Sequence, residues 1–267
     1  MSAIKSYFKQ QFQFQKFGLN YESETDFYVS CFQRNISPLP LLCVRGLIFL
    51  TCIGIILSSF ILTTIYVSAA TWPIYMTHWG LVLITLSSGF GFGVSATAYF
   101  KGPIDFSFGL PWYIKVYWVL YSISIPIAFF ITVFYWIFLA NENAEFAATV
   151  VLDIFIHAIN SVLMLLLFIT ARQPTNLLHF YLPFFFAVIY AIFSAIYYVA
   201  GGTDPFGNKF IYPVLDWAEP GTAMIMIALS AILILVLHFI IAMLTICRDA
   251  FGRFCRQDND GFKLSAY

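Results

Sequence analysis

Three polar residues in strongly apolar surroundings have the side chains needed for catalysis. Asp153 is the one charged residue within the six long apolar stretches of the chain, and His157 follows it one helical turn later. An ionised side chain in a bilayer is costly, so one that is kept there is a functional-site candidate. Thr77, in IYMTHWGL, stands at the start of another apolar stretch. A hydroxyl, an imidazole and a carboxylate can act as nucleophile, general base and orienting group.

The spacing of Asp153 and His157 places both side chains on one face of a helix, because residues four apart are neighbours there. Asn160 and Ser161 continue the same face and extend it into a polar seam. Two interpretations stay open. The seam provides hydrogen bonds that hold helices together, or it forms a reactive or ligand-binding site. Thr77 has its own structural alternative, since a threonine near a helix start often serves as a cap or packing residue.

The elements that must position these residues are membrane-spanning helices. Hydrophobic residues make up 61% of the 267 residues and charged residues only 10%, whereas a soluble domain is nearer a quarter charged. Lipid cannot satisfy backbone polar groups, so long apolar spans must be helices, and about 20 residues suffice to cross the hydrocarbon core. The predicted fold is all-α, a six-helix transmembrane bundle with spans at residues 46–68, 76–100, 116–140, 147–170, 177–200 and 221–246.

These spans divide the chain into a lead (residues 1–45), a six-span transmembrane domain (46–247) and a tail (248–267). Of the 13 Lys and Arg residues, only Lys209 falls in a loop on the side opposite to the termini. Positive residues mark the cytoplasmic face, so both termini are predicted to be cytoplasmic. The lead is expected to form either a short interfacial helix or a strap docked on the bundle.

Charge and cysteine content exclude several kinds of partner. The formal net charge is zero, so no long-range attraction to nucleic acid is expected. His179 and His238 have no metal-ligand spacing with a second ligand, so we expect neither a metal nor another cofactor. The five cysteines are too few for a disulfide framework. Cys247 and Cys255 lie among basic residues at the end of the last span. Two states stay open for them: palmitoylated, or unmodified thiols.

Several segments together resemble the rolling stone family of insect and invertebrate membrane proteins. They spread across most of the chain in the family's order, and read FYVSCFQRNISPLPLLCVRGLIFL, YMTHWGL, HAINSVLMLL and IYPVLDWAEPG. The resemblance implies an integral protein of the plasma membrane that is linked to myoblast fusion during muscle development. Membrane lipid is then the expected partner, and its protein partners stay open.

A second resemblance is to the androgen-induced family of six-span hydrolases, which cleave fatty-acid esters of hydroxy fatty acids. Those enzymes use a threonine at the start of the second span and a histidine in the fourth. Thr77 in YMTHW and His157 in HAIN fall at the corresponding places. This resemblance implies an intramembrane hydrolase with Thr77 as nucleophile, His157 as base and a hydrophobic acyl substrate, and Asp153 is our candidate for orienting His157.

A channel or transporter that uses the polar seam as its pathway is a third hypothesis. One acid and one histidine are few polar residues to line a transport pathway. No interrupted helix or internal repeat in the sequence marks a transport site. The decisive observation is therefore the distance between the Thr77 hydroxyl and the His157 ring. A separation of about 3 Å supports chemistry.

Overall fold

The computed structural model describes residues 8–105, 107–140 and 149–256, and it contains six helices long and apolar enough to cross a membrane. The predicted all-α six-helix bundle is confirmed. The first three spans are α2 (Leu39–Tyr66), α3 (Met76–Lys101) and α4 (Trp112–Phe134), which continues into the π turn η4 (Tyr135–Leu139). The fourth is formed by α5 (Val150–Ile154), the π turn η5 (Phe155–Ile159) and α6 (Asn160–Thr170). The last two are α7 (Tyr181–Val199), entered through the 3-10 turn η6 (Leu177–Phe180), and α8 (Pro220–Arg256).

The first and the last membrane-spanning helices are longer than the apolar stretches from which they were predicted. Helix α2 begins at Leu39, with Pro40 in its first turn, where proline is tolerated because the first backbone N–H groups of a helix have no partner within it. Helix α8 extends to Arg256. The predicted domain limits at residues 45 and 248 therefore lie inside helices, and residues 257–267 of the predicted tail lie outside the described part of the chain.

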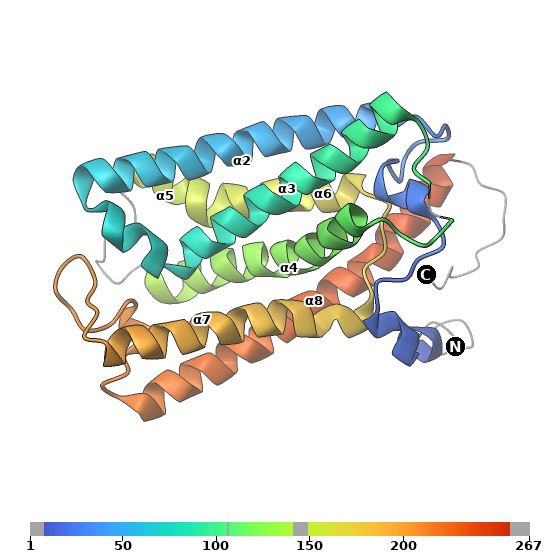
Figure 1. Cartoon of the computed structure of the whole chain (residues 1–267). Coiled ribbons are helices and arrows are strands. Elements are labelled where there is room, and N and C mark those ends of the chain that lie inside the picture. The colour runs from blue at the N-terminus through green and yellow to red at the C-terminus, as the bar shows by residue number, and fades with distance from the viewer. Residues whose placement is uncertain (1–7, 106, 141–148, 257–267) are drawn as a thin grey trace.

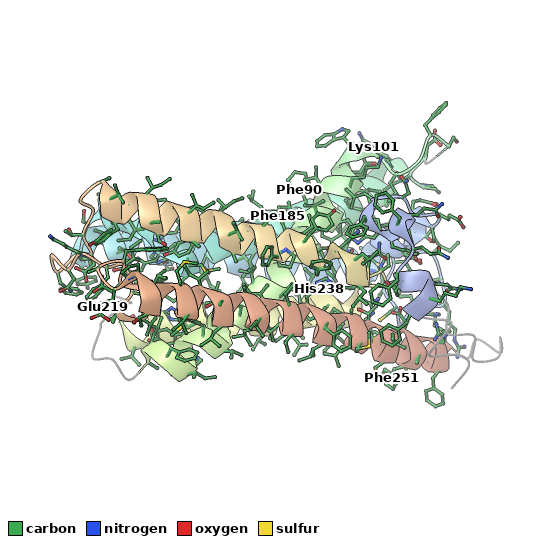
Figure 2. The ribbon with its side chains drawn as sticks, turned by 90° about the horizontal axis from the view of Figure 1, so that it is seen from below. Phe90, Lys101, Phe185, Glu219, His238 and Phe251 are labelled. Carbon is green, nitrogen blue, oxygen red and sulfur yellow. The ribbon has the colours of Figure 1, made fainter. Side chains whose placement is uncertain are left out.

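Helix α4 lies at the centre of the bundle and packs against α3, α6, α7 and α8 (Figure 1). Helix α2 covers α3 and α6 on one side, while α7 and α8 pack together on the other. Figure 2 shows α7 and α8 from outside, with Phe185 on the outward face of α7; this side chain is exposed, as a lipid-facing residue would be. The central position of α4 brings residues from distant parts of the sequence together.

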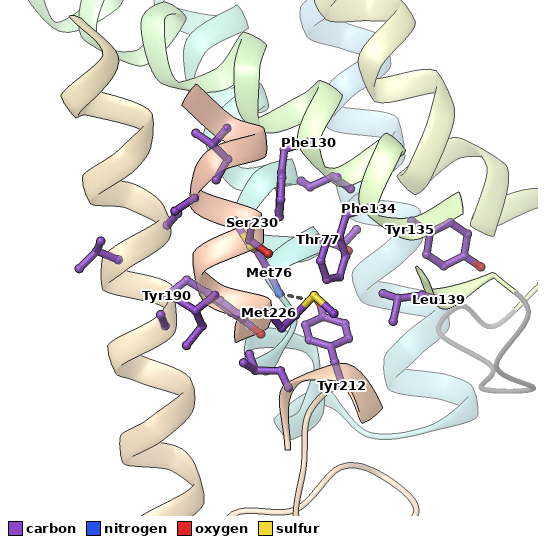
Figure 3. A pocket seen from close by; sticks show the side chains of 18 of the residues that line it. Met76, Thr77, Phe130, Phe134, Tyr135, Leu139, Tyr190, Tyr212, Met226 and Ser230 are labelled. Atoms are coloured by element: carbon purple, nitrogen blue, oxygen red, sulfur yellow. Dashed lines mark hydrogen bonds between the residues drawn. The ribbon is translucent and has the colours of Figure 1, made fainter. Parts of the chain in front are cut away.

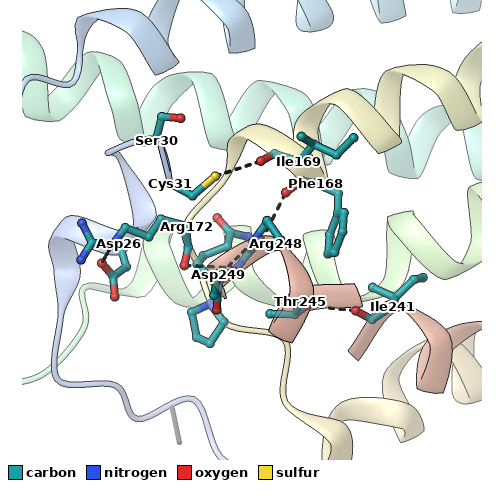
Figure 4. Close-up of polar contacts among 12 residues, drawn as sticks. Asp26, Ser30, Cys31, Phe168, Ile169, Arg172, Ile241, Thr245, Arg248 and Asp249 are labelled. Atoms are coloured by element: carbon teal, nitrogen blue, oxygen red, sulfur yellow. Dashed lines mark hydrogen bonds and ion pairs between the residues drawn. The ribbon is translucent and has the colours of Figure 1, made fainter. Parts of the chain in front are cut away.

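The lead is a strap docked on one end of the bundle, which we call the inner end in keeping with the predicted orientation. Asp26 of the strap pairs with Arg172 at 2.9 Å (Figure 4), and Arg256 at the end of α8 donates to the carbonyl oxygen of Cys31. Burial raises the pKa of Asp26, while Arg172 opposes that shift. The strap and the end of α8 thus lie on the same end of the bundle, as an even number of spans requires. That this end is cytoplasmic stays a prediction.

Arg45 fastens the strap to the helices. Its side chain is fully buried and donates to the Phe27 carbonyl (2.6 Å), the Gly91 carbonyl (3.1 Å), Ser95 Oγ (2.8 Å) and Tyr117 Oη (2.9 Å). These acceptors belong to the strap, to α3 and to α4. Gly91 allows this close approach, because a Cβ atom there would lie 2.8 Å from the Tyr117 ring. One guanidinium therefore joins four segments of the chain.

Arg45→Met should destabilise the protein by roughly 2–3 kcal/mol, because it leaves several buried acceptors without a donor. The melting temperature of the purified protein in detergent should fall accordingly. Arg34→Met removes an exposed arginine near the same end and should leave the melting temperature almost unchanged. Equal melting temperatures for the two variants would contradict the fastening role of Arg45.

Candidate active site

The structure brings Thr77 and His157 together although 80 residues separate them. Thr77 is the second residue of α3, and the extended backbone of Tyr75 turns the chain into this helix. The Thr77 hydroxyl lies 3.3 Å from Nε2 of His157, and both side chains are buried. The convergence that the sequence left open is thus present in the fold.

Asp153 lies on the opposite side of the His157 ring. Its Oδ1 atom is 2.9 Å from His157 Nδ1. An ionised carboxylate can only accept hydrogen bonds. Nδ1 therefore carries the ring proton and donates a hydrogen bond to Asp153. The lone pair of Nε2 then accepts from the Thr77 hydroxyl. The three predicted residues form a hydroxyl–imidazole–carboxylate chain in the order expected of a nucleophile, a base and an orienting group.

Tyr135, which the sequence analysis did not single out, completes the surroundings of His157. Its ring stacks on the imidazole with 3.5 Å between centroids and 3° between planes. Its hydroxyl donates to Asp153 Oδ2 at 2.6 Å. Both carboxylate oxygens of Asp153 are therefore hydrogen-bonded, and the imidazole is held in its plane. In the sequence, Tyr135 is one tyrosine near the end of the third span. Because 20% of the chain is aromatic, it does not stand out there.

Both helices that face each other at this site depart locally from α-helical geometry. Tyr135 begins the π turn η4, and His157 lies within the π turn η5. Such turns are rare and are frequent at functional sites. Each accommodates an extra residue and so changes the direction of the side chains that follow it.

The polar seam divides at the second π turn. Asn160 donates to the Ile156 carbonyl at 2.8 Å, within its own span. Ser161 donates to the Ala128 carbonyl of α4 at 2.7 Å and pairs with Thr132 at 2.6 Å. Ser161 therefore links the fourth span to α4, as the structural interpretation expects. Asp153 and His157, at the other end of the seam, form the site with Thr77.

A cavity of about 90 Å³ lies beside Thr77 (Figure 3). Residues of α3, α4, α7, α8 and the loop at 200–219 line it, and none of those described is charged. Most are aromatic or aliphatic, and the hydroxyl groups come from Thr77, Tyr135, Tyr190, Tyr212 and Ser230. From Met226 to Ile234 the lining of α8 alone extends about 12 Å along the helix axis. The lining is thus elongated and apolar, which suits an acyl chain.

A second, smaller cavity joins Thr77 to His157 and is also lined by Tyr75, His78, Leu139 and Tyr212. Thr77 thus borders both cavities. Among the described residues no group of three or more His, Cys, Asp or Glu side chains is arranged to hold a metal ion. His238, which has no metal-ligand spacing in the sequence, donates to the carbonyl oxygens at the turn into α7.

The fold and this site define a six-span, all-helical integral membrane protein with a buried polar centre beside an apolar cavity. The sequence profile described as "Protein rolling stone" matches residues 2–256. The protein of that name from Drosophila melanogaster is 30% identical over 229 residues, which cover 82% of this chain and 81% of the fly protein. The chain therefore belongs to the rolling stone family, as its sequence motifs indicated. No solved structure matches it significantly.

The hydrogen-bond order at His157 can be tested by NMR of protein labelled with ¹⁵N-histidine. We expect Nδ1 to carry a ring proton in the wild type, because Asp153 accepts from that atom. Asp153→Asn should weaken this preference, whereas Asp105→Asn, a change at an exposed residue, should leave the His157 signals in place. A wild-type ring protonated only on Nε2 would refute this arrangement.

Proposed function

We propose that this protein is an intramembrane hydrolase of acyl esters, with Thr77 as nucleophile, His157 as general base and Asp153 as the residue that orients the base. The observation that carries the proposal is the 3.3 Å separation of Thr77 Oγ1 and His157 Nε2. Hydroxyl and base in an unliganded site are often slightly farther apart than in the complex with substrate. The separation is therefore suited to proton transfer.

The first half of the reaction transfers the acyl group to the protein. His157 Nε2 takes the hydroxyl proton as Thr77 Oγ1 attacks the ester carbonyl carbon. The tetrahedral intermediate then collapses, the bond to the leaving oxygen breaks, and His157 gives its proton to that oxygen. The alcohol departs and an acyl-Thr77 ester remains. Asp153 stabilises the imidazolium that forms between these steps.

The second half uses water and restores the site. His157 Nε2 takes a proton from a water molecule, whose oxygen attacks the acyl-Thr77 carbonyl. Collapse of that intermediate breaks the bond to Thr77 Oγ1, which regains its proton from His157. The products are a fatty acid and the free hydroxyl of Thr77.

The apolar cavity supports a lipid substrate. Aromatic and aliphatic side chains give an acyl chain surroundings as apolar as the lipid that it leaves, so the chain can enter without exposure to water. Thr77 is part of the cavity lining, so a chain bound there can present its carbonyl carbon to the hydroxyl. The membrane itself is then the source of the substrate.

Thr77→Ala should lower ester hydrolysis by about 10³-fold or more, because it removes the nucleophile. His157→Ala should lower it by about 10²- to 10⁴-fold through loss of the base. The assays are hydrolysis of a fluorogenic acyl ester and labelling by a fluorophosphonate probe, both on purified protein. Thr85→Ala is the matched control, since that hydroxyl donates within α3 to the Leu81 carbonyl. Unchanged hydrolysis and labelling in Thr77→Ala would refute the proposal.

We further propose that the protein acts at the plasma membrane in cell–cell fusion, as the family resemblance implies. The loop at 200–219 is compact rather than extended: Asp204 accepts from the backbone of Phe206 and Asn208, and Tyr212 is buried. A loop of this size provides little of the roughly 800 Å² that each partner of a stable complex buries. Modification of lipids where two membranes meet fits these dimensions better than adhesion does.

Removal of the protein from fusion-competent myoblasts should reduce the number of multinucleate cells. Re-expression of the wild type should restore fusion, whereas Thr77→Ala should not, because the lipid ester would stay intact. Fusion that is unaffected by removal would refute the role in fusion. Full rescue by Thr77→Ala, at equal surface expression, would show that fusion does not need the hydrolase.

A further inference from the structure

Tyr212 places a third polar group at the nucleophile. It is a buried residue of the loop at 200–219 and lines both cavities that meet at Thr77. Its hydroxyl oxygen accepts from the backbone N–H of Met76 at 3.0 Å, the contact drawn in Figure 3. The same hydroxyl also interacts with the side chain and backbone of Thr77 and with the side chain of Tyr190. The loop thus presents one phenol directly to the proposed reaction centre.

Ester cleavage at Thr77 requires a hydrogen-bond donor that the three residues described above do not supply. When Thr77 attacks, a carbonyl oxygen becomes an oxyanion, and a preorganised donor at that position is usually the largest source of rate acceleration. The Thr77 hydroxyl and the His157 ring are occupied in proton transfer. His78 also borders the small cavity, and its Nδ1 atom is hydrogen-bonded to the Trp72 carbonyl.

Tyr212 has the properties of such a donor. Burial raises the pKa of its hydroxyl, so the group keeps its proton. The Met76 N–H holds the phenol oxygen in place and polarises its O–H bond, which strengthens a hydrogen bond donated by that group. Because Tyr212 borders both cavities that meet at Thr77, its hydroxyl can reach the carbonyl oxygen while His157 holds the nucleophile.

We propose that the Tyr212 hydroxyl stabilises the oxyanion formed when Thr77 attacks the acyl ester; this inference rests on the proposed hydrolase function. As the bond from Thr77 Oγ1 to the carbonyl carbon forms, the π electron pair of the carbonyl moves onto its oxygen. Tyr212 donates a hydrogen bond to that oxygen and keeps its proton. When the intermediate collapses, the electron pair returns, the bond to the leaving oxygen breaks, and the leaving oxygen takes its proton from His157.

The test compares Tyr212→Phe with Tyr197→Phe in the purified full-length protein. Tyr197 is a suitable control because its hydroxyl bonds the same loop, at the Thr203 carbonyl (2.8 Å), without touching Thr77. Tyr212→Phe should lower kcat for an acyl ester by about 10²-fold, the usual cost of one lost oxyanion donor, with little change in KM. Tyr197→Phe should keep the wild-type kcat.

A pair of inhibitors separates oxyanion binding from a structural role. An acyl trifluoromethyl ketone forms a hemiketal oxyanion with the nucleophile, whereas the matching ether only fills the cavity. Tyr212→Phe should weaken binding of the ketone by about the factor lost in kcat and leave binding of the ether unchanged. Equal weakening of both inhibitors, or an unchanged kcat, would overturn the role of Tyr212.

Fluorinated tyrosine provides a variant that keeps the ring and its contact with Met76. With 3,5-difluorotyrosine at position 212, kcat should gain a new decline at alkaline pH, where the more acidic phenol loses its proton and can no longer donate. A pH profile identical to that of the wild type would overturn the proposal even if Tyr212→Phe failed to fold. If the wild type showed no Thr77-dependent hydrolysis, the hydrolase would be refuted together with this role. Normal hydrolysis in the wild type and in Tyr212→Phe would refute only the role of Tyr212.

Discussion

The architecture around the site follows from the cost of placing a carboxylate in a membrane. A polar group that faces lipid without a partner costs several kcal/mol, so the carboxylate of Asp153 must be satisfied by neighbouring helices. It accepts from His157 on its own span and from Tyr135 on α4. Meeting this requirement fixes the imidazole in one plane and one tautomer. The same contacts that satisfy the carboxylate therefore orient the imidazole toward Thr77.

At the inner end of the bundle, buried charged groups are likewise satisfied by partners from neighbouring segments. Arg45 is surrounded by neutral acceptors from the strap, α3 and α4, and Arg248 is paired with Asp249 at 2.7 Å. Arg248 also donates to backbone carbonyls, including that of Gln173. These groups link segments and border neither of the two cavities at Thr77. Thr77 differs from them because it lines both cavities. Polar groups at the inner end serve assembly, while those at the outer end adjoin room for a ligand.

The sequence predicts some of these features well and others not at all. Spans, their number and the polar candidates were predictable, because lipid imposes length, helicity and low charge on every span. The meeting of Thr77 and His157 depends on how α3 packs beside the fourth span, which no local pattern encodes. The seam prediction assumed an unbroken α-helix and so missed the division that accompanies the π turn at Phe155–Ile159. Tyr135 and Tyr212 were missed because tyrosine is common in this chain and neither stands at a distinctive spacing.

The location of the site also explains how a lipid and a water molecule could both reach it. Thr77 is the second residue of α3 and Asp153 the fourth of α5, so each lies within about 5 Å of a helix start by helical rise. Lipid ester carbonyls lie at a similar depth, near the edge of the hydrocarbon core. The apolar cavity is lined largely by α4, α7 and α8, whereas α5, which carries Asp153, packs against α2, away from α7 and α8 (Figure 1). The Asp153 side chain is 20% exposed against 3% for His157. An acyl chain would therefore approach Thr77 from one side, and the water needed to release it would approach the base from the other.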